Sequence, residues 1–408
     1  MAFIDNTGSL GSTTLLGRRR ALGLLAVAGA GAGTIIGLDP AAARAATLTI
    51  PPAAPPAPSD AEWAAFEDFL NELAAAGTFS GAVLVTHAGV PVVEFASGLA
   101  DRDIGLPIDV DSRFDIASVG KMFTGVAIGQ LVQGAGLAFD DPIGKYLSGI
   151  PADIANEITI HHLLTHTSGL GDFMRRDQPY PEAARSAVTA TDLLPLIVAE
   201  PLQFQPGTSH AYSNAGFMVL GAVVESLAAE SYYDFVRATI FEPAGMTRTD
   251  WLVPGQDDDN TATGYMLVGD DGAPLPPQQA GGVAVGELVA NTDLVPWGSP
   301  AGGAYSTVGD LQRFSSSLLD HELLIPDMTV TVLDGTVPVD GRDDLSTAYG
   351  FEDLTLNGVR IVGHGGGAPG VGAVVDMYPE LDYTVAILTN CDGSLVDVHR
   401  GTQDILTS

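Results

Sequence analysis

Positive charge is scarce in this chain, and lysine is the scarcest charged residue. Only Lys121 and Lys145 occur among 408 residues, and the formal net charge is -33. Nucleic acids and anionic membrane surfaces would repel such a chain, so neither is an expected partner. The rarity of lysine draws attention to each one, because an amine can lose its proton in a protein whereas a guanidinium cannot.

Cysteine and long apolar runs are also nearly absent. The single Cys391 cannot form an internal disulfide, and its position at the end of an apolar run predicts a buried small side chain rather than a reactive thiol. No run after the first 45 residues is long and apolar enough to cross a bilayer. Hydrophobic residues still make up 46% of the chain, which is enough for a large core, so we expect a globular protein.

Residues 1–45 have the pattern of an export signal. Three arginines, Arg18 to Arg20, precede a mild, glycine-rich apolar run, and a small-residue A-x-A site ends at Ala45. This pattern is typical of a twin-arginine signal peptide, and a retained membrane anchor is the alternative. We expect cleavage, a Pro-rich linker over 46–60, and an exported protein that is extracellular, periplasmic or bound to the cell wall. No stable membrane insertion is expected after cleavage.

Strand patterns gather near both ends of the mature chain. β-forming runs flank Ala88-Gly89 and Asn357-Gly358, and both dipeptides favour hairpin turns. Apolar residues recur at helical spacing over 60–77, which predicts a helix before the first hairpin. Helical patterns fill most of the middle of the chain.

These patterns predict one α/β (α+β) domain. We expect an antiparallel sheet built from both chain ends, with flanking helices and a mainly helical insertion. The acidic, Pro/Gly-rich stretch 255–291 is expected to form loops. The expected boundaries are 61–408 for the domain, about 61–140 and 300–408 for its sheet part, and about 141–299 for the insertion.

Ser118 and Lys121 are candidate catalytic residues. They lie three residues apart near the start of a predicted buried helix, so their side chains share a face. The helix N-terminus offers N–H groups near Ser118, and burial would lower the pKa of the Lys121 amine, allowing it to accept the serine proton. From these two residues alone, a capping serine and a surface lysine are the simpler interpretation.

Two further stretches contain groups suited to the same reaction. Tyr212 could pass a proton to a leaving group, and Asn214 could hold a substrate carbonyl or orient the lysine. His364 precedes three glycines, whose backbone can approach a substrate closely and donate N–H groups. The structural alternatives are a loop tyrosine with an Asn helix cap, and a glycine-rich turn after a strand.

Metal or cofactor chemistry is not expected. The spacing of His161, His162 and His166 does not place them on one helical face, and we expect them to pack or to brace a loop. No G-x-S-x-G surrounds Ser118, which argues against an α/β-hydrolase. No glycine motif for a nucleotide is present either.

The chain resembles the serine β-lactamase and penicillin-recognising superfamily in three motifs, which occur in the family's order and rough spacing. It is most similar to the class C-like branch, which contains D-alanyl-D-alanine carboxypeptidases, D-aminopeptidases and carboxylesterases. The resemblance implies a β-lactamase/transpeptidase-like fold. The three motifs are Ser118-x-x-Lys121, Tyr212-Ser213-Asn214 and His364-Gly365-Gly366.

The resemblance also implies a role for each matching residue. Ser118 would be the acylated nucleophile, Lys121 would accept its proton, and Tyr212 would relay protons to and from the leaving group. The other implied roles are substrate binding by Asn214, His364 and Gly366, and an oxyanion hole formed by the backbone N–H groups of Ser118 and Gly367.

His364 stands where class C β-lactamases have a lysine. A mostly neutral imidazole anchors a substrate carboxylate more weakly than an ammonium does, which favours peptidase or esterase activity over β-lactam turnover. We expect a secreted serine hydrolase that acts through an acyl-enzyme and most resembles a D-alanyl-D-alanine carboxypeptidase or D-peptidase. A carboxylesterase or β-lactamase is the alternative within the fold. A non-catalytic protein that binds cell-wall peptides or penicillin is the alternative from another class. The corresponding substrates are peptidoglycan stem peptides, small esters and β-lactams.

Overall fold

The computed structural model describes most of the chain beyond the N-terminal region. The expected export signal (1–45) and the first part of the expected linker (46–54) lie outside the described residues, and the expected domain boundaries stay predictions. Within the described ranges, no helix has both the length and the apolar character needed to span a membrane. These ranges are 55–134, 136–173, 181–252, 260–269, 287–291, 298–393 and 395–408.

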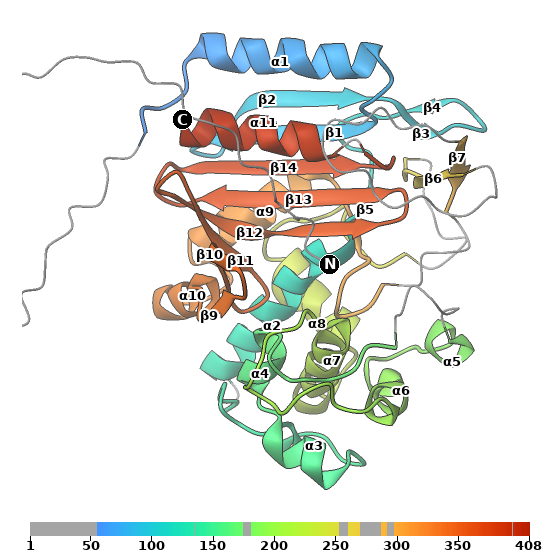
Figure 1. Ribbon diagram of the computed structural model, residues 1–408, viewed down its shortest axis with the longest axis vertical. Helices are drawn as coiled ribbons and strands as arrows, with labels where there is room; N and C mark the ends of the chain where they lie inside the picture. The colour runs from blue at the N-terminus through green and yellow to red at the C-terminus, as the bar shows by residue number, and fades with distance from the viewer. Residues whose placement is uncertain are drawn as a thin grey trace, which may run out of the picture. The chain divides into compact units, whose positions relative to one another are not determined.

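An eight-stranded antiparallel sheet forms the centre of the fold (Figure 1). Its strand order is β2-β1-β14-β13-β12-β11-β10-β9, so the first hairpin pairs with the last strand. The predicted sheet from both chain ends is therefore confirmed. The strands are β1 Gly81–His87, β2 Val90–Ser97, β9 Val337–Val339, β10 Arg342–Thr347, β11 Glu352–Leu356, β12 Val359–Ala368, β13 Val371–Tyr378 and β14 Tyr383–Thr389.

Two of the hairpin turns follow directly from the sequence. Ala88 and Gly89 have φ values of 50° and 72°, and Asn357 and Gly358 have values of 51° and 85°. Two successive residues with positive φ match the twist of antiparallel strands, as in a type I′ turn. The dipeptides that predicted these hairpins therefore lie at their tips.

Helices cover the sheet, and most of the helical region, which comes between its two halves in sequence, lies below the strands in the view of Figure 1. The helix predicted over 60–77 and the helical patterns of the middle region are present in the structure. The α-helices are α1 Asp60–Ala75, α2 Lys121–Gly134, α3 Ala152–Glu157, α4 Ile160–Leu164, α5 Glu182–Arg185, α6 Leu194–Ala199, α7 Asn214–Ala228, α8 Tyr232–Val236, α9 Val308–Leu319, α10 Pro326–Leu333 and α11 Leu395–Thr407.

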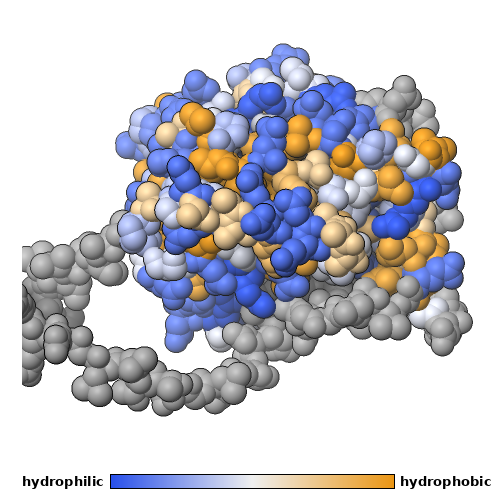
Figure 2. All heavy atoms as spheres, turned by 90° about the horizontal axis from the view of Figure 1, so that it is seen from above, coloured by the Kyte–Doolittle hydropathy of each residue, from blue (hydrophilic) through white to orange (hydrophobic). Residues whose placement is uncertain are grey.

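Helix α1 shows how the sequence sets one layer of the fold. Ser59 caps the helix in a capping box: its hydroxyl accepts from Glu62 N at 3.4 Å, and its own N–H donates to the Glu62 side chain at 2.7 Å. Trp63, Phe66 and Leu70 are buried at helical spacing and pack toward the sheet. Seen from above in Figure 2, the face over α1 is mostly hydrophilic with scattered hydrophobic residues.

Both faces of the central strands are buried. Val83 and Val85 of β1 belong to the apolar cluster beneath α1 and α11. Ala82 and Leu84, the alternate residues, belong to the larger cluster on the other face, where α9 packs. Because side chains alternate across a strand, this pattern needs helices on both sides of the sheet.

Helices α2 and α7 form the buried centre of the helical region and pack on each other. Residues 215–224 of α7 are all buried, and α2 is buried over most of its length. A helix that is apolar on all sides belongs inside a large core. Gly125 of α2 allows close packing, because a Cβ there would lie 2.0 Å from the carbonyl oxygen of Tyr349.

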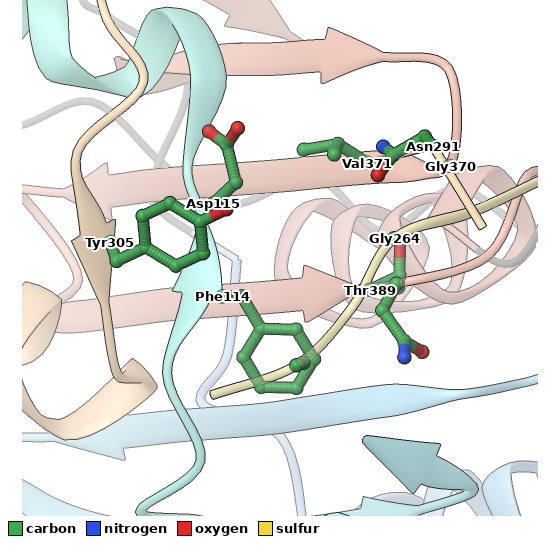
Figure 3. Close-up of a pocket in the computed structure, with 10 residues that line it drawn as sticks. Phe114, Asp115, Gly264, Asn291, Tyr305, Gly370, Val371 and Thr389 are labelled. Atoms are coloured by element: carbon green, nitrogen blue, oxygen red, sulfur yellow. The ribbon is translucent and has the colours of Figure 1, made fainter. Parts of the chain in front are cut away.

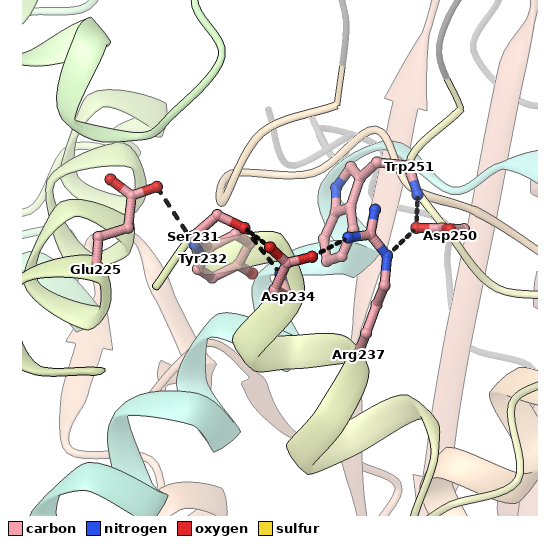
Figure 4. A network of polar contacts seen from close by, with 7 residues as sticks. All are labelled: Glu225, Ser231, Tyr232, Asp234, Arg237, Asp250 and Trp251. Carbon is pink, nitrogen blue, oxygen red and sulfur yellow. Dashed lines mark hydrogen bonds and ion pairs between the residues drawn. The ribbon is translucent and has the colours of Figure 1, made fainter. Parts of the chain in front are cut away.

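A buried polar contact joins α8 to α2. Tyr232 of α8 is fully buried, and its hydroxyl lies 2.7 Å from Thr124 Oγ1 on α2. Arg237, just after α8, reaches Asp234 through Nη1 and Asp250 through Nε, at 2.8 Å each (Figure 4). These ion-paired groups are partly exposed, so their net contribution to stability is small. The contact of Tyr232 therefore supports the back of the helix that begins at Lys121.

The prediction that residues 255–291 form loops is partly wrong. Two short strands there, β6 Tyr265–Val268 and β7 Glu287–Ala290, pair with each other, while 255–259 and 270–286 lie outside the described residues. All of β6 is buried, and Tyr265 N donates to Asn390 O at 2.8 Å. The apolar run Tyr265–Val268 carried a strand signal that the surrounding Pro and Gly residues obscured.

Candidate active site

Ser118 lies on a short 3-10 helix, η1 (Ala117–Gly120), that leads directly into α2. The sequence placed it at or near the first turn of a buried helix, and the structure places it just before that turn. The preceding strand β5 (Phe114–Asp115) pairs with β8 (Tyr305–Ser306), and Ile116 N donates to Ala304 O at 2.9 Å. The serine is thus held against a segment almost two hundred residues further along the chain.

The turn before Ser118 has an unusual backbone. Ala117 has a φ of 44°, a left-handed conformation that costs free energy for a residue other than glycine. Its N–H donates to Asp115 Oδ1 at 2.7 Å, and its carbonyl accepts from Gly303 N at 3.0 Å. Burial raises the pKa of Asp115 to about 6, although the bond from Ala117 opposes this shift. Together these contacts orient Ser118.

Lys121 forms the centre of the site and is completely buried. Its Nζ lies 3.1 Å from Ser118 Oγ, 2.8 Å from Asn214 Oδ1 and 2.6 Å from Ala301 O. Burial lowers the pKa of Lys121 to about 7, while the charge of Asp172 acts in the opposite direction. A neutral amine can donate its two protons to Asn214 and Ala301 and direct its lone pair at the Ser118 hydroxyl. This geometry suits a base for the serine proton.

Tyr212 lies beside this pair, with Lys121 Nζ 4.8 Å from its ring centroid. Burial raises the pKa of Tyr212 well above its ordinary value, and the nearby Ser118 side chain opposes the shift less strongly. Among the residues that the structure describes, none forms a hydrogen bond of normal geometry with the Tyr212 hydroxyl. Leaving a buried hydroxyl without such a bond costs free energy. An acceptor atom of a bound substrate could therefore form a favourable hydrogen bond with the Tyr212 hydroxyl.

Asn214 contacts the lysine and does not cap its helix. Ser213 is the N-cap of α7, and its hydroxyl accepts from Gly216 N at 3.2 Å. The Asn214 amide is therefore free to donate to Asp172 Oδ2 at 3.1 Å and to accept from Lys121. Between the two interpretations of this residue, the contacts favour the one in which it orients Lys121.

His364 and the glycines that follow it lie on β12. Burial lowers the pKa of His364 to about 3, the nearby Lys121 adds to the shift, and Nδ1 donates to Gly365 O at 2.5 Å. The imidazole is neutral, so it cannot act as a cationic anchor for a carboxylate. Its ring centroid lies 6.3 Å from that of Tyr212.

Strand β12 passes directly beside Ser118. A Cβ on Gly366 would lie 2.4 Å from Ile116 O and 3.0 Å from Ser118 N, so the strand can approach only as glycine. Among the described strands, β11 pairs with β12 only as far as Gly363, and residues 364–368 pair on one edge alone, with β13. The other edge of residues 364–368 thus has no strand partner within the described ranges, and its N–H and C=O groups are of the kind that an extended backbone can pair with. The oxyanion role of Gly367 on this strand stays a prediction.

We expect Gly366→Ala to damage the site far more than Gly365→Ala. The added methyl would push β12 away from η1, and overpacking of this kind costs about 1–3 kcal/mol or more. A Cβ on Gly365 meets no atom within 4 Å, so this neighbour is a matched control. Thermal unfolding and hydrolysis rates check the prediction, and equal melting temperatures for the two variants would contradict it.

The structure brings Ser118, Lys121 and Asn214 into contact, with Tyr212 and His364 beside them. Sequence reasoning missed other groups at the site. Nothing in the sequence indicated that the Ala301 carbonyl belongs to the site, because every residue has a backbone carbonyl. Three further side chains lie around the motifs: Asp115, His166 and Asp172.

A small pocket lies beside Asp115, three residues before Ser118 in the sequence (Figure 3). Phe114, Asp115 and Tyr305 line one part of it, and Asn291 and Gly370 line another. None of Ser118, Lys121, Tyr212 and His364 is among its lining residues, so we do not assign it to the substrate. Within the described ranges, no group of three or more His, Cys, Asp or Glu side chains could hold a metal ion.

Comparison with known proteins identifies the family. The Beta-lactamase family model matches residues 66–407, which is most of the chain. The chain therefore belongs to the β-lactamase family and is a serine hydrolase of the β-lactamase fold. The family and fold that the three motifs predicted are confirmed.

Individual relatives differ in the activity that their names describe. Penicillin-binding protein 4* of Bacillus subtilis (strain 168) is 29% identical over 324 residues, which cover 76% of this chain and 68% of the relative. Esterase EstB of Burkholderia gladioli is 29% identical over 286 residues, or 65% of this chain and 71% of the esterase. The crystal structure of a penicillin-binding protein from Bacillus halodurans has a TM-score of 0.73 and 31% identity, and covers 82% of this chain and 98% of that one.

Proposed function

We propose that the protein cleaves amide or ester bonds through an acyl-enzyme on Ser118, and that its main substrates are peptides ending in a D-amino acid. The observation that carries the proposal is the buried Lys121 amine, 3.1 Å from the Ser118 hydroxyl and bound to two further acceptors. A binding protein that forms no covalent bond would have no use for a desolvated amine in this position.

The reaction can be written with these residues. Ser118 Oγ attacks the substrate carbonyl carbon while its proton moves to Lys121 Nζ, and nearby backbone N–H groups stabilise the oxyanion. As the bond to the leaving group breaks, Tyr212 gives its proton to the departing nitrogen or oxygen and regains one from Lys121. Water then attacks the ester carbonyl and gives a proton to the neutral Lys121 Nζ, which passes it to Ser118 Oγ as that oxygen leaves and the acid is released.

Two features support a peptide substrate. The edge of β12 over residues 364–368 that no described strand pairs with could hydrogen-bond an extended backbone, which a small ester does not have. Two of the relatives reported above are named as penicillin-binding proteins. Esterase activity is the second candidate, because another relative is named as an esterase and the neutral His364 needs no charged substrate group. β-Lactam turnover ranks third.

Cellular location forms part of the proposal. The twin-arginine pattern over 1–45 supports export, with the mature enzyme outside the cytoplasmic membrane. Its substrates would then be available at the cell wall.

Parallel rate measurements test the substrate class. We expect an N-acetylated peptide ending in D-Ala-D-Ala to be cleaved at least about tenfold faster, in kcat/KM, than its L-Ala-L-Ala counterpart. p-Nitrophenyl butyrate is the ester substrate and nitrocefin the β-lactam substrate, and the rate of uncatalysed hydrolysis is subtracted for each. Equal cleavage of the two peptides, or greater acceleration of the ester, would contradict the peptidase assignment.

A further inference from the structure

We propose that His166 is a positioning residue that holds Tyr212 as the proton donor to the leaving group, and that it does so as a neutral imidazole. This inference rests on the proposed function, because it assigns Tyr212 a role in acylation. His166 lies just after α4, and 5% of its surface is exposed.

His166 contacts three consecutive residues, Ala211 to Ser213, the last two of which belong to the second motif. Its carbonyl accepts from Ala211 N at 2.9 Å, and its Nδ1 accepts from Ser213 N at 3.1 Å. Between these bonds, its ring lies 4.4 Å from the Tyr212 ring, centroid to centroid, with 31° between the planes. The backbone on both sides of Tyr212 and one face of its ring are therefore fixed by a single residue.

The backbone at His166 is a second, independent observation. Its φ is 58°, and it occupies the position after the helix cap where glycine is usual. Thr167 N donates to His162 O at 2.9 Å and His166 N to Leu163 O at 3.4 Å, which completes a Schellman turn. A non-glycine residue at positive φ is strained, so the buried side chain must contribute something that glycine would not.

The bond from Ser213 N requires an unprotonated Nδ1, so the ring proton is on Nε2. Tyr212 faces the ring. Burial lowers the pKa of His166 well below its ordinary value, and the nearby Lys121, His364 and His210 add to this shift. The ring consequently stays neutral while Lys121 titrates. It is therefore suited to hold the tyrosine in place and not to exchange protons with it.

Two variants separate the contributions of His166. His166→Asn tolerates positive φ and keeps an acceptor near the Nδ1 position, whereas His166→Phe keeps a ring and loses the acceptor. His162→Phe is the matched control, because His162 Nδ1 also accepts a backbone N–H, from Thr159 at 3.3 Å. His166→Phe and His162→Phe thus each lose one hydrogen bond from a backbone N–H to an imidazole Nδ1.

The test compares two substrates with the same N-acetyl-D-alanyl group, one an amide and one a thioester. An amine must be protonated to leave, whereas a thiolate leaves without a proton, so only the amide needs Tyr212 as an acid. We expect His166→Phe to lower kcat/KM for the amide about 100-fold and to change that for the thioester less than about threefold. His166→Asn should recover most of the amide rate, and His162→Phe should keep the ratio of the two substrates.

Several outcomes would overturn the inference. A loss of the same size on both substrates would show a general effect on folding, and the same would hold if His166→Asn were as impaired as His166→Phe. If His166→Phe does not fold, the inference fails unless His166→Asn keeps the ratio of kcat/KM for the amide to kcat/KM for the thioester near that of the natural enzyme.

A second background gives a further check. In Tyr212→Phe, the His166 substitutions should not change this ratio further, because the proton donor that His166 positions is already absent. Wild-type protein that cleaves neither substrate would refute the proposed function and this inference together, whereas wild-type activity with an unselective His166→Phe would refute the inference alone.

Discussion

Ser118→Ala should lower hydrolysis by a factor on the order of 10⁵ to 10⁶, the loss seen when a serine hydrolase loses its nucleophile. The fold should be unaffected, because Ser118 is partly exposed and its hydroxyl contacts groups of the site, such as Lys121 Nζ, and not the core. Intact mass measurement after exposure to a fluorophosphonate should show one added group on the natural protein and none on the variant.

Ser226→Ala is the matched control for this experiment. Ser226 is exposed on α7, and its hydroxyl donates only to Tyr146 O, at 2.7 Å, within the described contacts. This variant should label and hydrolyse like the natural protein. Labelling of Ser118→Ala with undiminished stoichiometry would show that another residue is the nucleophile.

Lys121→Met should lower kcat/KM for acylation by about 10² to 10⁴, the range that a general base contributes. Methionine fills most of the buried volume but cannot accept a proton, and arginine would fail too because it stays protonated. The variant leaves Asn214 Oδ1 and Ala301 O without their donor, so some loss of stability should accompany the loss of rate. Lys145→Met, at the other lysine of the chain, is an exposed control in a surface pair with Asp141, and its rates should be unchanged.

The pH dependence of the natural enzyme follows from the same residue. Below its pKa of about 7, Lys121 is protonated and cannot accept the serine proton. The value of kcat/KM should therefore rise about tenfold per pH unit up to about pH 7 and level off above it. This rising limb should be absent from the residual activity of Lys121→Met. A flat profile for the natural enzyme between pH 5 and 8 would contradict the role of Lys121 as the base.

The sequence predicted those parts of the fold that local patterns determine. The hairpins at Ala88-Gly89 and Asn357-Gly358 were predictable because few dipeptides fit two successive positive φ values. Helix α1 was predictable from its apolar spacing. The pairing of Ser118 with Lys121 followed from helix geometry, and the ordered motifs made the chance interpretation untenable.

The remaining features depend on where distant segments meet. The Ala301 carbonyl contacts Lys121 through a backbone atom, which no residue type encodes. Alanine at position 117 gives no sign of its left-handed conformation. His166 was expected to brace a loop, but the sequence could not show that the second motif was the segment it contacts. Such contacts arise only from the path of the whole chain.

The pairing of β1 with β14 has a consequence for synthesis of the protein. Gly81 pairs with Thr389, so the sheet cannot close until about three hundred further residues have left the ribosome. Contacts of such long sequence separation make folding slow and leave early segments exposed in the meantime. The serine turn packs against β12, which is also translated late. A nascent or truncated chain that ends before β12 would therefore contain Ser118 and Lys121 but have no assembled site, and activity would appear only after nearly the whole chain is made.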